Sequence, residues 1–100
     1  MRIKRRSDLK ESPVFGVYNK LGKTYFLCVP ENYKGLLAVS LDEVDITDRR
    51  LGPDFVFWEN PEGVVGLYHE RLLVRNALEG MLEHDAEAFE DFCRHVVTTP

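Results

Sequence analysis

Residues 55–68, FVFWENPEGVVGLY, decide how the second half of the chain folds. The run from Phe55 to Trp58 consists of aromatic and β-branched residues, which favour strands. Asn60, Pro61 and Gly63 then occupy the first, second and fourth positions of a turn, which is the preferred chemistry of type I. A second apolar run follows directly at 64–68. This segment therefore predicts a tight β-hairpin.

Two runs near the start of the chain predict an earlier hairpin. Residues 14–18 and 24–29 are rich in β-branched and aromatic side chains, and a polar gap that contains Gly22 separates them. A gap of this length predicts a bulged or longer loop. Pro30 ends the second run, because proline has no amide hydrogen to give to a ladder.

The middle of the chain predicts two more strands. Residues 36–41 form an apolar run, which predicts the most buried strand. Polar and apolar residues alternate strictly over 43–47, which places Val44 and Ile46 on the core face of a half-exposed strand at an edge.

The period of the sequence changes after Glu70. Apolar residues at 74, 77, 78, 81 and 82 recur at spacings of three and four, which predicts an amphipathic helix. Asp85 is a competent N-cap for a second stretch of the same period, which extends to Val96. Gly80 either breaks the helix or is tolerated within it. The sequence leaves open whether the segment is one kinked helix or two.

The predicted fold class is therefore α+β: an antiparallel β-meander of five to six strands packed against one or two C-terminal α-helices. A chain of 100 residues is of the size that forms one core. Residues 1–12 are basic and poor in apolar side chains, so we expect an N-terminal arm that is mobile or lies loosely along the sheet. Residues 13–100 are expected to form a single α+β domain.

Cysteine content and the N-terminus predict a cytoplasmic protein. No apolar stretch reaches the length of a membrane span, and no apolar run of signal-peptide length follows the basic start. Cys28 and Cys93 both stand among apolar neighbours, which indicates two buried free thiols instead of a disulfide framework.

No catalytic or metal signature emerges from the sequence, so we expect neither an enzyme nor a cofactor. Gly22-Lys23-Thr24 has the tail of a phosphate loop, but Val17 stands where that motif requires its first glycine. The spacing of His84, Cys93 and His95 does not suit a zinc site on one helix. The acids of 42–48 lack the order of a calcium loop.

Charge is distributed unevenly along the chain, whose net charge is -4. Residues 1–35 hold eight Lys and Arg against three acids, whereas residues 36–100 hold five against fourteen. Such asymmetry affects association and steering more than fold.

We therefore expect a small acidic non-catalytic binding protein that engages a basic protein partner, for example an immunity or antitoxin-type inhibitor. Its acids are expected to form one continuous negative surface, which would give fast and salt-sensitive association. The predicted partner-binding residues are Asp42, Glu43, Asp45, Asp48, Glu79, Glu83, Glu87, Glu90 and Asp91.

The alternative is a nucleic-acid-binding accessory or regulatory protein. Arg2, Lys4, Arg5 and Arg6 could contact phosphates, and Tyr18, Tyr25 and Phe26 could stack on bases. The predominance of acids over the rest of the chain opposes this reading. A third and weaker reading is an enzyme whose site combines His69 with nearby acids.

Overall fold

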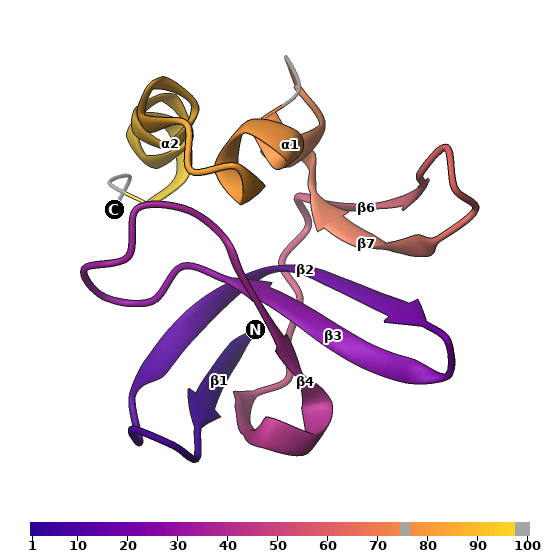
Figure 1. Ribbon diagram of the computed structural model, residues 1–100, viewed down its shortest axis with the longest axis vertical. Helices are drawn as coiled ribbons and strands as arrows, with labels where there is room; N and C mark the ends of the chain where they lie inside the picture. The colour runs from indigo at the N-terminus through magenta and orange to yellow at the C-terminus, as the bar shows by residue number, and fades with distance from the viewer. Residues whose placement is uncertain (75–76, 98–100) are drawn as a thin grey trace.

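The computed structural model describes residues 1–74 and 77–97, and within them an antiparallel sheet lies against a C-terminal layer of short helices (Figure 1). The predicted α+β class, with an antiparallel sheet and C-terminal helices, is confirmed. The strands are β1 (Arg2–Arg5), β2 (Glu11–Lys20), β3 (Lys23–Cys28), β4 (Leu37–Ser40), β5 (Val44–Asp48), β6 (Phe55–Glu59) and β7 (Val65–His69). The helical elements are the 3₁₀ turns η1 (Leu41–Glu43) and η2 (Glu70–Leu73), the helices α1 (Ala77–Leu82) and α2 (Ala86–Phe92), and the π-helical turn η3 (Cys93–Val97).

Strand β2 is the centre of the sheet. The order β4-β3-β2-β1-β5 is antiparallel throughout, and β7 also pairs with β2, with β6 beyond it. Strand β3 occupies one edge of β2, while β1 pairs with the start of β2 and β7 pairs with residues 16–18. Strands β1 and β7 therefore follow one another along the opposite edge of β2.

The predicted mobile arm was wrong, because residues 2–5 form strand β1 between β2 and β5. Ile3, the one apolar residue of this strand, is 0% exposed. Its basic neighbours find acidic partners: Arg2 pairs with Glu11, and Arg5 pairs with Asp8. A strand with one apolar residue among cations gives no periodic signal, and its pairing partners are what order it.

Two separate cores lie on the two faces of the sheet. The first core takes residues from all five strands β1 to β5, so these strands wrap around it: Ile3, Val14, Phe26, Cys28, Val39 and Val44. The second core joins the sheet to the helices: Phe15, Leu27, Leu36, Tyr68, Leu72, Met81 and Phe92.

Strands β2 and β3 supply side chains to both cores. Val14 lies in the first core and Phe15 in the second, and Phe26 and Leu27 divide in the same way. The register of β2 against β3 shifts between Val14 and Gly16. A Cβ at Gly16 would lie 3.0 Å from side-chain atoms of both Leu27 and Tyr68, so glycine allows this close approach.

Both predicted hairpins exist, and one turn differs from its prediction. The Asn60 side chain accepts hydrogen bonds from the amides of Glu62 and Val64, and the Gly63 amide donates to the Asn60 carbonyl, as expected for the β6–β7 turn. The β2–β3 loop is a tight turn instead of a long one. Leu21 and Gly22 have φ values of 53° and 81°, which is the left-handed geometry of a two-residue hairpin turn.

The middle strands are less buried than the sequence predicts. Strand β4 has its Ala38 side chain exposed, so 36–41 is not a uniformly buried run. Strand β5 lies at an edge of the sheet, as expected, and Val44 is buried. Ile46 lies on the same face as Val44, as predicted, because it stands opposite the buried Ile3 in the register of β1 and β5. At this edge of the sheet its side chain is nevertheless 36% exposed.

The C-terminal segment contains two helices, which resolves the alternative that the sequence left open. The break comes at His84, whose φ is 61°, and not at Gly80. The Asp85 side chain then caps α2 by accepting from the amides of Glu87 and Ala88. Gly80 lies where the helices cross, because a Cβ there would be 2.8 Å from the Cβ of Ala88.

Candidate partner-binding surface

The acids that the sequence predicts as one surface lie in two groups at opposite ends of the molecule (Figure 1). The first group belongs to η1 and β5, and the second belongs to α1, α2 and the link between them. The expected continuous acidic surface was therefore wrong. Strands β6 and β7 and the turn η2 lie between the two groups in the sequence, and the sequence does not show that these elements carry the chain to the other end of the molecule.

Arginines of the same chain partly neutralise the first group. Arg6 pairs with Asp45 at 3.0 Å and also donates to the main-chain carbonyl of Asp42. Arg50 pairs with Asp48 at 3.2 Å, and hydrogen bonds from Arg50 lower the pKa of that carboxyl. Of this group, the carboxylates of Asp42 and Glu43 have no ion pair within residues 1–74 and 77–97.

The second group keeps most of its charge unpaired. Glu79, Glu83, Glu87 and Glu90 are exposed, and in the described part of the chain no ion pair joins any of them to a cation. Asp91 differs, because Arg71 lies 3.9 Å and His95 3.6 Å from its carboxylate. The unpaired glutamates make the helical end the more strongly negative surface.

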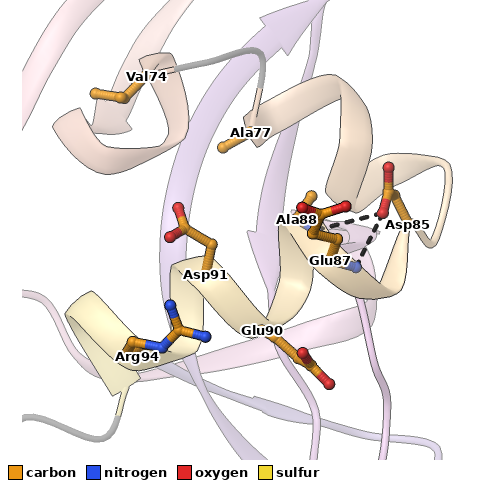
Figure 2. Close-up of a pocket in the computed structure, with 8 residues that line it drawn as sticks. All are labelled: Val74, Ala77, Asp85, Glu87, Ala88, Glu90, Asp91 and Arg94. Atoms are coloured by element: carbon orange, nitrogen blue, oxygen red, sulfur yellow. Dashed lines mark hydrogen bonds between the residues drawn. The ribbon is translucent and has the colours of Figure 1, made fainter.

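Part of this group surrounds a hollow of about 440 Å³ beside α2 (Figure 2). The Asp85 carboxylate is occupied by the α2 amides, and the Glu90 side chain points away from that of Asp91. Among residues 1–74 and 77–97, no group of three or more His, Cys, Asp or Glu side chains is placed to hold a metal ion. The hollow is lined by Val74, Ala77, Asp85, Glu87, Ala88, Glu90, Asp91 and Arg94.

A larger hollow, here called the turn–helix groove, lies between the β6–β7 turn and α1. Its volume is about 620 Å³, and it combines acids with exposed apolar side chains. Glu79 and Glu83 are the predicted residues that it contains. Its lining residues are Trp58, Asn60, Pro61, Glu62, Leu72, Leu73, Leu78, Glu79, Leu82 and Glu83.

Sequence reasoning missed the apolar part of this groove. Leu82 belongs to the apolar face that the sequence predicts for this helix, but it is 44% exposed. The sequence did contain a signal for a surface that combines apolar and acidic side chains. Leu78 and Leu82 are four residues apart and lie on one side of the helix, and Glu79 and Glu83 lie beside them at the same spacing. The contribution of Trp58 could not be found in the same way, since it depends on how the hairpin packs against α1.

The residues of the nucleic-acid alternative are largely engaged elsewhere. Three of its four cations, Arg2, Arg5 and Arg6, pair with carboxylates of this chain. Tyr18 and Tyr25 stack on one another with their ring centroids 5.3 Å apart, and Phe26 is buried. The geometry therefore does not favour binding of phosphates and bases by this surface.

His69 has a structural position at the end of β7. Its Nδ1 accepts a hydrogen bond from the amide of Arg71 at 3.1 Å and thereby caps η2. Phe15, Phe55 and Phe92 meet its ring edge-on. Burial lowers the pKa of His69, although Asp54, whose carboxylate is 3.9 Å from Nε2, acts in the opposite direction.

This lowered pKa predicts that acid weakens the fold. The unfolded chain protonates His69 near pH 6.5, whereas the folded chain does so at lower pH. Between these two values the unfolded state binds more protons, so stability falls as pH drops below about 6.5. Urea unfolding between pH 7.5 and 5 should show a decreasing midpoint. His69→Asn, which keeps a capping side chain, should reduce the decrease; an unchanged dependence would contradict this role.

Cys28 and Cys93 form no disulfide, as predicted, but the expected burial holds for Cys28 and was wrong for Cys93. Cys28 is buried in the first core, and burial raises its pKa to about 11. Burial also raises the pKa of the partly exposed Cys93. Both shifts disfavour the thiolate, which is the nucleophilic form.

Within the described residues, no helix has the length and apolar character that crossing a bilayer requires.

No family model matches the chain, and no match was found among curated proteins or solved structures.

Proposed function

We propose that this chain is a small acidic non-catalytic binding protein that engages a basic protein through its helical end. The observation that carries the proposal is the set of four exposed glutamates at 79, 83, 87 and 90, for which the described residues provide no ion-pair partner. Carboxylates without an internal partner keep their field in the surrounding solvent, which steers a positively charged protein toward them.

The proposal assigns a smaller role to the η1–β5 group. Asp45 and Asp48 already have Arg6 and Arg50 as partners, so a basic protein would have to compete with those arginines. Exposed ion pairs contribute little free energy, so a basic protein can compete with these arginines. Its net attraction to the η1–β5 group is nevertheless smaller than its attraction to the helical end. The partner is therefore expected to approach α1 and α2 first.

In the most concrete version of the proposal, the partner is a basic enzyme and this chain is its inhibitor. An immunity protein or an antitoxin acting on a nuclease works in this way, because an acidic surface occupies the site that nucleic acid would otherwise take. Small size and excess negative charge support this version of the proposal, and the partner's identity decides it.

Affinity capture at low salt from the native cell tests the proposal. The tagged full-length chain should retain a basic protein that dissociates as salt is raised, since screening weakens exposed charge pairs. The charge-reversed variant Glu87→Lys/Glu90→Lys should bind the captured protein at least about tenfold more weakly in isothermal titration calorimetry.

The matched control reverses two exposed acids outside the surface, Glu31→Lys/Glu70→Lys. It changes the net charge by the same amount and should retain most of the affinity. Equal losses in both variants would show that only total charge matters. Recovery of no basic protein, or of one that high salt does not release, would contradict the proposed function.

A further inference from the structure

The turn–helix groove differs from the rest of the acidic end because its floor is apolar. Trp58 from β6 and Leu78 and Leu82 from α1 line it, and Leu82 remains 44% exposed. An exposed apolar floor gains free energy when a partner side chain covers it, in proportion to the area removed from water. A partner that bound through its charges alone would leave this apolar floor exposed to water.

Three carboxylates surround that floor. Glu62 comes from the β6–β7 turn, and Glu79 and Glu83 come from α1 and the residue after it. Within residues 1–74 and 77–97, none of the three has an ion pair. Among the described residues, Lys20 is the one cation in the lining of an adjoining smaller hollow, which shares Trp58, Asn60, Glu62, Leu78 and Leu82 with the groove.

We infer that the groove binds a short cationic amphipathic segment of the basic partner, in which arginines stand beside a leucine-like side chain. This inference rests on the proposed function and names the groove as the place where the basic partner attaches. The apolar side chain would cover Leu78 and Leu82, while arginine stems would lie along Trp58 and their guanidinium groups would reach the carboxylates.

Charge complementarity selects this occupant over a second copy of the chain. A second copy has a net charge of -4 and would bring further acids toward Glu62, Glu79 and Glu83. A purely polar cation would satisfy the carboxylates and leave the apolar floor in water. An arginine-rich amphipathic segment satisfies both parts of the groove.

Trp58 provides a direct probe, because it is the only tryptophan in the chain. The full-length protein is titrated with a synthetic peptide of alternating arginine and leucine, and with a peptide of equal charge in which serine replaces leucine. The arginine–leucine peptide should shift Trp58 emission to shorter wavelength and bind at least about tenfold more tightly than the serine peptide. Equal affinities, or no change in Trp58 emission, would overturn the inference.

Variants locate the site. Glu79→Gln/Glu83→Gln should weaken binding of the arginine–leucine peptide about tenfold, whereas the control Glu31→Gln/Glu70→Gln should leave it within about twofold. Leu82→Ser should remove most of the preference for the arginine–leucine peptide over the serine peptide. Circular dichroism establishes that each variant is folded.

The outcomes separate this inference from the proposed function. If Glu87→Gln/Glu90→Gln weakens peptide binding more than the groove pair does, the anchor lies elsewhere on the helical end; the inference fails and the proposed function stands. If Trp58 emission shifts with protein concentration in the absence of peptide, a second copy occupies the groove and the inference fails. If cells yield no basic partner while the peptide binds as described, the proposed function fails and the groove assignment stands.

Discussion

Deletion of residues 1–6 should abolish cooperative folding, although these residues have the composition of a dispensable basic tail. The deletion removes β1, which pairs with both β2 and β5, and with it the buried Ile3. Strand β5 would lose its only partner in the described sheet, and the first core would open to water. Far-ultraviolet circular dichroism and urea unfolding of the truncated chain measure the effect.

Ile3→Ala tests the same feature in the full-length chain. Shortening a fully buried side chain costs about 2 to 5 kcal/mol, out of a total stability of about 5 to 15 kcal/mol for an ordinary domain. The matched control is Leu21→Ala, at a position that is 96% exposed, which should change stability by less than about 0.5 kcal/mol. A truncated chain that still unfolds in one sharp transition at the original midpoint would contradict the role of β1.

Phe92→Ala should cost about 3 to 5 kcal/mol, which is the usual range for removing a buried aromatic ring. Phe92 is the buried residue that α2 contributes to the second core, where it meets Phe15 edge-on with centroids 5.1 Å apart. It also contacts the ring of His69. The free energy of unfolding in urea, followed by the fluorescence of Trp58, measures the loss.

Phe57→Ala is the control for this substitution. It removes the same ring from β6, where the Phe57 side chain is 70% exposed, so stability should change by less than about 1 kcal/mol. A smaller loss at Phe92 than at Phe57 would mean that α2 contributes little to the fold.

Local chemistry explains what the sequence predicts well. The β6–β7 hairpin follows from Asn60, Pro61 and Gly63, whose turn preferences act within four residues. The Asp85 cap likewise depends only on its own helix. Such features need no knowledge of the rest of the chain.

Features that depend on residues far away in the sequence could not be predicted from the sequence. Strand β1 has one apolar residue and is ordered by β2 and β5, so its local composition resembles that of a loose tail. Ile46 takes the predicted face opposite Ile3, but its side chain stays 36% exposed because β5 is an edge strand. In both cases burial depends on the neighbours that the fold supplies, not on the residue itself.

The candidate site shows the same division. The sequence identifies the acids correctly as candidates, but it cannot show that Arg6 would meet Asp45, a residue 39 positions away. It also cannot show that a hairpin would bring Trp58 beside Leu78. Charges that are isolated along the chain can be paired in space, and only the fold distinguishes them.

The alternation of β2 and β3 between the two cores has a consequence for how the molecule opens. Val14 and Phe15 are neighbours that face different interiors, as are Phe26 and Leu27. Separation of either strand from its neighbours would disrupt both interiors in one event. The slowest amide hydrogens to exchange with deuterated water should therefore lie in these two strands, and they should exchange only when the whole molecule unfolds.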